Sequence, residues 1–128
     1  MSPSIETAVD QKLLLALFRV ENSEDLEFLE EAIASFLENT PKLLQAMREG
    51  VLRPDAVSLQ RASHSLKATS ASFAAKRLPG LCKLLEAIAK VAVQGETTVP
   101  EEAEELVQQI EGEYERVKAE LLKLDLKI

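Results

Sequence analysis

The sequence predicts an all-α fold: an antiparallel up-down four-helix bundle with an additional short N-terminal helix. Apolar residues recur every three or four positions along nearly the whole chain, and no segment alternates apolar and polar residues as a strand does. Only 4% of the 128 residues are aromatic, whereas 46% are hydrophobic. A core of Leu, Ile, Val and Ala suits helices packed on helices, and this length suits a single domain over residues 1–128.

The first two helices are marked by helical periodicity and by capping residues. Residues 7–19 are expected to form the short first helix. Asn22 or Ser23 can cap the second helix, which carries a long apolar stripe. Pro41 lies inside this stripe, and because the stripe resumes in register beyond it, we expect a kink rather than an end. Gly50 is expected to terminate the helix.

Prolines and glycines also place the third and fourth helices. Pro54 is expected to open the third helix. A proline is tolerated only in the first turn of a helix, where the backbone N–H has no helical partner. Pro79 therefore predicts a break between residues 73 and 76, followed by a fourth helix that ends at Gly95.

The last helix is predicted from a capping signature and a long apolar stripe. Thr98 and Glu101 match the capping box S/T-x-x-E, with Pro100 in the first turn. Apolar residues then recur in steps of three and four as far as residue 124. They are Ala103, Leu106, Ile110, Tyr114, Val117, Leu121 and Leu124.

Composition limits the compartment and the partners. The longest apolar runs are too short to span a bilayer, and the N-terminus does not resemble a secretory signal. Cys82 is the only cysteine and cannot form an internal disulfide, so we expect a reducing, cytoplasmic setting and no membrane. A net charge of −7 argues against nucleic acid as the main partner. We expect a monomer.

The charge is distributed unevenly along the chain. Residues 41–90 hold nine Lys and Arg against three acids, a local charge of +6. Because the whole chain has a net charge of −7, the other residues together carry −13. A basic middle in an acidic chain suggests a partner with an acidic surface. The alternative is a chance asymmetry of solvated faces, and charge alone does not separate the two.

Most catalytic and metal sites are excluded by counting residues. With one histidine and one cysteine, the chain cannot build a Cys/His zinc cluster or the paired Glu-x-x-His motifs of a di-iron bundle. Phosphate-binding glycine loops and a nucleophile elbow are also absent from the sequence. Cys82 is expected to be a small buried hydrophobe, with a reactive thiol as the weaker reading. His64 is left as the candidate reactive residue.

A helical wheel places His64 on the outer face of the third helix. At about 100° per residue, His64 lies roughly 160° from Leu66, which defines the core direction. It is therefore expected to point to solvent. The buried stripe is expected to comprise Leu59, Ala62, Leu66, Thr69 and Phe73.

The neighbours of His64 on this face suit a nucleophile approached by another protein. Free imidazole is largely neutral at pH 7, so one ring nitrogen keeps a lone pair. Lys67, at i+3, can place an ammonium near a group attached to the ring, and Ala68 and Ala71 are small enough to leave the ring accessible. Gln60 and Arg61 lie on the same outer face. A lone exposed histidine followed by lysine is nevertheless common, and by itself is weak support for a function.

The segment that begins at His64 resembles the signature of the histidine-containing phosphotransfer (HPt) family. That pattern reads roughly A-H-[ST]-L-K-G-[SA]-[SA]-x-x-[LF]-G-A-x-x-L-x-x-L-C-x-x-L-E. The matching residues are HSLKATSASFAA at 64–75, followed by Leu78, Leu81, Cys82, Leu85 and Glu86. The resemblance extends over about residues 9–124, including the Phe-Leu pairs at 28–29 and 36–37 and Glu113-Tyr114.

Three positions depart from the family pattern. Ser63 precedes the histidine where alanine is usual, which should be harmless. Ala68 replaces the glycine that commonly follows the lysine, so docking is expected to be tighter or more selective. Ala74 replaces the glycine of a Gly-Ala pair at the turn between helices, which calls the local backbone geometry into question.

The resemblance implies a phosphorelay intermediate rather than a free-standing enzyme. His64 would accept a phosphoryl group from a receiver-domain aspartate and pass it to another receiver, and Lys67 would stabilise it. Partners would be response-regulator receivers or a hybrid histidine kinase, docking on Gln60, Arg61, Ala68, Ala71 and the adjoining second helix. The chain would need no metal or cofactor, because Mg²⁺ would belong to the receiver.

Two other readings remain open. The chain resembles the phosphorylated domain of a chemotaxis-type histidine kinase, in which an ATP-binding domain supplies the phosphate. It would then be a fragment, since nothing in it resembles an ATP site. A non-catalytic receiver-docking bundle is the other alternative, although such proteins generally lack the histidine that is present here.

Overall fold

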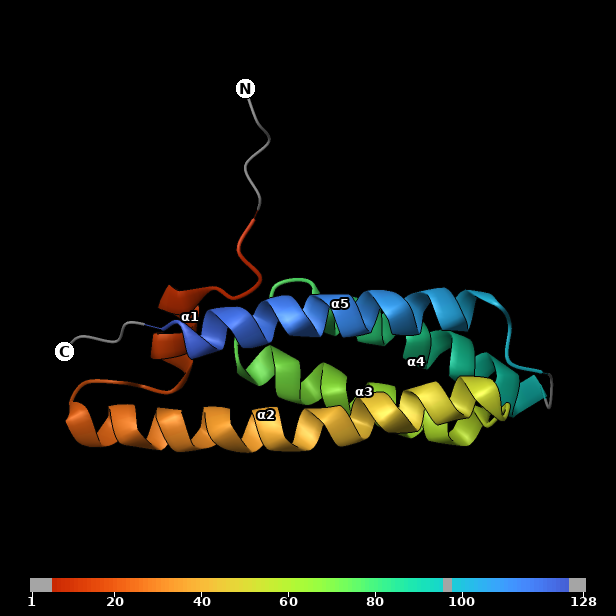
Figure 1. The fold of residues 1–128 in the computed structure, drawn as a ribbon, viewed down its shortest axis with the longest axis horizontal. Coiled ribbons are helices and arrows are strands. Elements are labelled where there is room, and N and C mark those ends of the chain that lie inside the picture. The colour runs from red at the N-terminus through yellow and green to blue at the C-terminus, as the bar shows by residue number, and fades with distance from the viewer. Residues whose placement is uncertain (1–5, 96–97, 125–128) are drawn as a thin grey trace, which may run out of the picture.

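Four long helices form an antiparallel bundle, and a short helix lies at one end of it (Figure 1). The structure, a computed structural model, describes residues 6–95 and 98–124. Successive long helices run in opposite directions, which confirms the predicted all-α up-down architecture. The helices are α1 (Gln11–Leu17), α2 (Ser23–Leu52), α3 (Ala56–Ser72), α4 (Leu78–Gly95) and α5 (Glu102–Leu122).

The core is aliphatic, with a small aromatic cluster near α1. Leu66 and Leu85 are fully buried, as are Val107 and Ile110. Fully burying one such side chain stabilises the fold by roughly 1.5–3 kcal/mol. The ring centroid of Phe36 lies 4.7 Å from that of Phe73 and 6.0 Å from that of Tyr114. Phe18, just after α1, lies 5.4 Å from Phe73, so α1 covers this end of the core.

Helices α1 and α2 confirm the predicted elements and correct their boundaries. Helix α1 begins later than predicted, because Asp10 caps it by accepting a hydrogen bond from the backbone N–H of Leu13. Asn22, not Ser23, caps α2. Helix α2 continues through Pro41, as predicted, and the expected end at Gly50 is wrong, since α2 extends to Leu52.

Gly50 serves close packing instead. It is buried inside α2, and a β-carbon at this position would lie 2.9 Å from Cγ of Leu59 on α3. That distance is too short for ordinary van der Waals contact. Glycine therefore lets α3 approach α2 where the two helices are joined.

Helix α3 begins at Ala56, two residues beyond the proline that was predicted to open it. Asp55, rather than Pro54, caps the helix: its Oδ1 accepts a hydrogen bond from the backbone N–H of Ser58 and its Oδ2 accepts one from the Ser58 hydroxyl. These bonds hold the pKa of Asp55 below its ordinary value of 3.8. The predicted break before α4 is confirmed, with Pro79 in the first turn of α4.

The predicted capping box of α5 is wrong. Helix α5 begins at Glu102, Glu101 occupies the cap position without a side-chain hydrogen bond, and Thr98 lies upstream and exposed. Pro100 precedes the helix, where its carbonyl accepts a hydrogen bond from the N–H of Ala103. The local pattern matched, but residues 98–100 are not helical, so Thr98 lies too far ahead of the first helical residue to cap it.

The N-terminal segment ties the α3–α4 turn to α5. The Glu120 carboxylate on α5 accepts hydrogen bonds from the backbone N–H groups of Ala8 and Val9, at 2.6 and 2.9 Å. Val9 also forms an antiparallel bridge with Ala75. Segments at both ends of the sequence thus hold the turn that joins α3 to α4.

Candidate functional site

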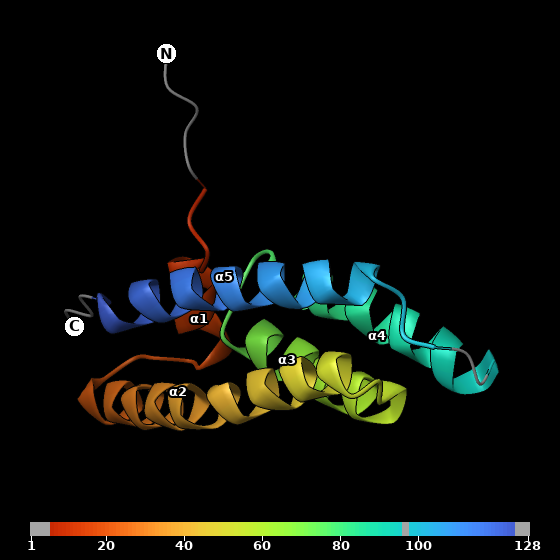
Figure 2. The same ribbon diagram turned by 45° about the vertical axis from the view of Figure 1, so that its right-hand side comes forward.

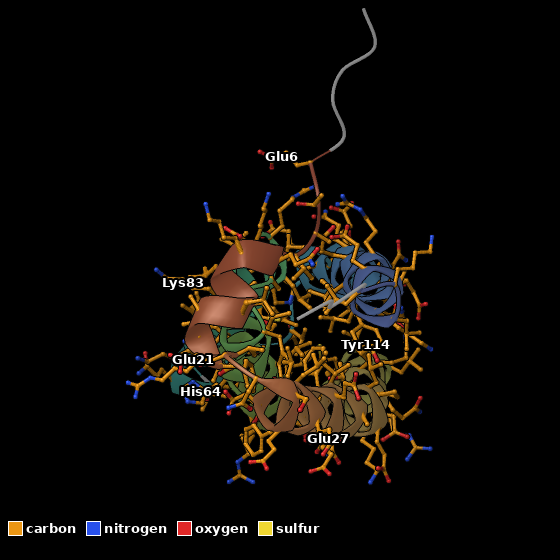
Figure 3. All side chains as sticks on the ribbon, turned by 90° about the vertical axis from the view of Figure 1, so that its left-hand side faces the viewer. Glu6, Glu21, Glu27, His64, Lys83 and Tyr114 are labelled. Atoms are coloured by element: carbon orange, nitrogen blue, oxygen red, sulfur yellow. The ribbon has the colours of Figure 1, made fainter. Side chains whose placement is uncertain are left out.

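His64 lies near the middle of α3 and projects from the outer flank of the bundle. Its side chain is 67% exposed. Figure 3 shows it on the same flank as Lys83 of α4, whereas Tyr114 points into the bundle. The buried positions Leu59 and Leu66 lie on the opposite face of α3, as the wheel predicts.

For one residue of the predicted buried stripe, Thr69, the prediction of burial is wrong. Thr69 is exposed, and Ser63 and Ser70 are buried instead. The stripe is shifted toward α4 because α3 packs most extensively against that helix. The two serine hydroxyls are tolerated in the core because they donate hydrogen bonds to backbone carbonyls of α3, at 2.6 Å from Ser63 to Leu59 and 3.3 Å from Ser70 to Lys67.

A carboxylate on α4 joins His64 to Lys67. Oε2 of Glu86 lies 2.5 Å from Nδ1 of His64, and Oε1 of Glu86 accepts a hydrogen bond of 2.5 Å from Nζ of Lys67. The Glu86 side chain is only 18% exposed. We refer to His64, Lys67 and Glu86 as the histidine cluster.

Glu86 is the residue of the candidate site that reasoning about the His64 helix alone missed. No second titratable acid lies beside His64 on α3, and the acid comes from the neighbouring helix. The signal was present in the sequence, because Glu86 closes the L-C-x-x-L-E portion of the family pattern. Its pairing with His64 depends on how α3 and α4 pack, which the pattern does not specify.

The electrostatics of the cluster define the state of the imidazole. The hydrogen bond from Lys67 lowers the pKa of Glu86 from its ordinary value of 4.5, the bond from His64 lowers it further, and desolvation opposes both. Glu86 is therefore ionised at neutral pH and can only accept hydrogen bonds. Nδ1 of His64 consequently carries the proton facing Glu86. In the neutral ring, Nε2 then holds the free lone pair.

The other predicted site residues lie around the histidine cluster on α3 and make no side-chain hydrogen bond to it. Gln60 is half-buried, whereas Arg61, Ala68 and Ala71 are exposed on α3. The small alanines leave the exposed ring without bulky neighbours on its own helix. The structure thus provides a nucleophilic nitrogen on an accessible surface, with a cation close by.

Cys82 takes no part in this chemistry. It is buried in the core of α4, one turn before Glu86. Burial raises the pKa of its thiol to about 12, and the charge of Glu86 acts in the same direction. Thiolate is the reactive form, so the alternative of a reactive thiol is not supported.

The described part of the chain holds neither a metal-binding cluster nor a membrane-spanning helix. Among residues 6–95 and 98–124, no group of three or more His, Cys, Asp or Glu side chains is arranged to hold a metal ion. In the same part of the chain, no helix is both long and apolar enough to cross a bilayer.

A helical bundle with an exposed histidine on its third helix is the arrangement that the resemblance to HPt domains implied. The family model described as "Hpt domain" matches residues 31–120, which contain the whole histidine cluster. The chain therefore belongs to the Hpt domain family.

A solved structure supports the same assignment. The chain is similar to the histidine-containing phosphotransfer protein B (HptB) from Pseudomonas aeruginosa PAO1, with a TM-score of 0.72 and 25% sequence identity. The similarity covers 88% of this chain and 89% of HptB. No curated protein matches the sequence significantly.

The structure also explains one departure from the family pattern. Ala74, which stands where the family usually has glycine, adopts a φ of +59° in the turn between α3 and α4. This left-handed region costs an L-residue roughly 1 kcal/mol, whereas glycine enters it freely. The turn keeps this geometry with alanine because the Ala74 carbonyl accepts a hydrogen bond of 2.9 Å from the N–H of Asp10.

Proposed function

We propose that this protein is a phosphorelay carrier in which His64 accepts a phosphoryl group from a receiver-domain aspartate and returns it to the aspartate of another receiver. The observation that carries the proposal is the contact between Nδ1 of His64 and the Glu86 carboxylate. It directs the free lone pair of Nε2 away from α4. An exposed nitrogen in this state is suited to an in-line attack on phosphorus.

In the transfer, the Nε2 lone pair forms a bond to phosphorus while the P–O bond of the receiver's aspartyl phosphate breaks. The aspartate leaves as a carboxylate, and the imidazole keeps its Nδ1 proton facing Glu86. The ring becomes formally cationic, and the anionic carboxylate stabilises that charge. Return of the group reverses these steps. Mg²⁺ bound by the receiver would neutralise charge on the transferring group.

Lys67 is proposed to stabilise the phosphoryl group. Its ammonium is held by Glu86 one helical turn from His64, so it is close to the reacting ring before any group is attached. A phosphoryl group on Nε2 adds negative charge that a nearby ammonium can offset. The side chain is partly exposed, which leaves it room to move.

The proposed partner is a receiver domain that docks around His64. Gln60, Arg61, Ala68 and Ala71 surround the histidine on α3, and the surface would extend onto α2. The basic residues of α3, Arg61 and Lys67, suit the acidic pocket in which a receiver binds Mg²⁺. Such a relay would operate in the cytoplasm.

The decisive experiment is phosphotransfer from a phosphorylated receiver to the wild type and to His64→Gln. We expect label on the wild type alone, and the label should be lost in acid but retained in base, as for a phosphohistidine. Full labelling of His64→Gln, or acid-stable label, would contradict the proposal. Parallel incubation with a kinase catalytic domain and ATP tests the chemotaxis-type alternative. Receiver binding without any transfer would indicate a docking bundle.

A further inference from the structure

Helix α4 is apolar on nearly all sides, although part of it faces solvent. Its charged residues are Lys83, Glu86 and Lys90, which lie on one face at spacings of three and four, on the side that meets His64. A second exposed face carries no charge. This face, here called the α4 stripe, consists of Leu84, Ala87, Ile88 and Val91.

The α4 stripe is unusual for a solvated helix. Val91 is 67% exposed, Leu84 and Ala87 are also exposed, and Ile88 is half-buried. Leu84 is followed by stripe residues three, four and seven positions further on, which is the spacing of a helix seam packed against another helix. Contiguous exposed apolar surface of this kind commonly marks an interaction site.

The C-terminal half of the stripe borders a hollow in the surface. Ala87, Ile88 and Val91 line it together with Thr98 and Pro100, and its volume is about 380 Å³. Figures 1 and 2 both show the C-terminal turns of α4 extending past the neighbouring ends of α2 and α3. This part of α4 therefore projects from the bundle and is accessible to a partner.

The two edges of the stripe carry opposite charges. Lys83 and Lys90 lie along the edge toward α3, and both are exposed. At the other edge, Pro100 is followed directly by the exposed acids Glu101 and Glu102 at the start of α5. A surface with one basic and one acidic edge is self-complementary when it is rotated so that each edge meets the opposite one.

We propose that the α4 stripe is the interface of a symmetric dimer of this chain, with the two α4 helices side by side and parallel. A two-fold axis parallel to the helices brings Lys90 of one copy to the acidic edge of the other. An antiparallel pairing would instead place lysines against lysines. Charge complementarity therefore selects both a second copy and its direction.

The dimer is expected to be weak and to leave the histidine cluster accessible. One helix stripe with its edges is smaller than the roughly 800 Å² per partner of a standard stable interface, so association should depend on concentration. His64 lies beyond the lysine edge and not on the stripe. The proposal replaces the monomer expected from the sequence and does not rest on the proposed phosphotransfer.

The first test is sedimentation of the full chain from about 1 µM to about 1 mM, a range that resolves weak dimers. We expect reversible dimerisation of the wild type. Val91→Glu should weaken it by about tenfold or more, because a charge would be buried in the seam. Leu122→Glu is the matched control: Leu122 is 64% exposed at the other end of the bundle, and the change should have no effect.

The second test addresses the direction of pairing. Lys90→Glu should weaken the dimer, and adding Glu102→Lys should restore it. Circular dichroism melts will show that each variant is folded. A wild type that is monomeric throughout, equal effects of Val91→Glu and Leu122→Glu, or a dimer strengthened by Lys90→Glu would each overturn the proposal. Receiver-dependent labelling of His64 should be unchanged in Val91→Glu, which separates this test from that of the relay.

Discussion

Oε2 of Glu86 lies 2.5 Å from Nδ1 of His64, although 22 residues and a helix–helix turn separate the two in the sequence. The contact exists because α3 and α4 form the most extensively packed pair of helices in the bundle. The packing of α3 against α4 thereby fixes the position of the Glu86 carboxylate beside the exposed His64 ring. A change at Glu86 is expected to alter the chemistry of His64 without removing a core side chain.

Replacing Glu86 separates the effect of its hydrogen bond from that of its charge. In Glu86→Ala, Nδ1 of His64 loses its hydrogen-bond acceptor, and both neutral tautomers of the ring become populated. Transfer should therefore slow on the order of tenfold. This factor corresponds to the lower end of the free-energy range for a charge-assisted hydrogen bond, as expected at an exposed site. Glu86→Gln keeps an acceptor oxygen and should retain the Nδ1–H tautomer with a smaller loss. Nitrogen-15 NMR of the imidazole reports the tautomer directly. An unchanged tautomer in Glu86→Ala would contradict this role.

Lys67→Ala should affect the phosphorylated state more than the fold. The lysine is partly exposed and its polar contact is with Glu86, so its loss should shift the melting temperature little. The phosphoryl group on His64 would lose its nearest cation, and we expect slower transfer or a shorter lifetime. Lys83→Ala, on the same flank, is the matched control. Equal kinetics for the wild type and Lys67→Ala would identify the lysine as a solvated charge.

The lowered pKa of Glu86 predicts a difference in stability that appears only in acid. A carboxyl whose folded pKa lies below its unfolded value stabilises the fold above the unfolded pKa, and this contribution is lost as the pH falls through the folded pKa. The free energy of unfolding of wild type relative to Glu86→Gln should thus be constant near neutrality and decrease below pH 4.5. Urea denaturation at several pH values measures it. A difference that grows in acid would show that the sign is wrong.

The sequence predicted the helices better than it predicted their ends. Apolar periodicity is a local property, and it placed all five helices and the exposed face of His64. The position of a helix end depends on which residue caps it. Asp55 caps α3, so this helix begins after Asp55 and not at Pro54, and the predicted Thr98–Glu101 capping box does not form. Gly50 looked like a terminator, but its role is to admit Leu59, which lies on another helix. Such choices depend on tertiary packing that a local pattern does not contain.

The sequence likewise predicted part of the candidate site, namely the residues on α3, and not their contact with α4. The helical wheel gave the direction of His64, the i+3 spacing placed Lys67 beside it, and the family resemblance then gave both residues a role. The pairing of Glu86 with both required the relative placement of α3 and α4. The shift of the buried stripe from Thr69 to Ser63 and Ser70 has the same cause, because α4 packs on that side of α3.

Ala74→Gly should cost less stability than an ordinary substitution of a buried alanine by glycine. Ala74 is buried and has a φ of +59°. Glycine removes a steric cost of roughly 1 kcal/mol, which offsets the loss of the buried methyl group and the greater freedom of glycine in the unfolded chain. Ala62→Gly is the matched control, because Ala62 is equally buried but lies inside α3, where no such strain is relieved. Thermal melts should therefore show a smaller loss for Ala74→Gly, and equal losses would show that strain at the turn is negligible.

The proposed docking surface is tested most sharply by a bulky side chain beside the histidine. Ala71 is exposed on α3, about 20° from His64 on the helical wheel and two turns along the helix. Ala71→Trp should change stability by no more than about 0.5 kcal/mol, because no buried contact is altered. It should nevertheless obstruct a receiver surface and lower both receiver affinity and transfer rate at least about tenfold.

Ala119→Trp provides the control for this prediction, because Ala119 is likewise exposed but lies on α5. It should bind and accept phosphate like the wild type. Affinity can be measured by titration calorimetry with an unphosphorylated receiver, and transfer by loss of label from a phosphorylated one. If folded Ala71→Trp matches Ala119→Trp in both measurements, the receiver approaches His64 from another side. The docking surface would then have to be sought along α4, where Lys83 and Lys90 flank the same histidine cluster.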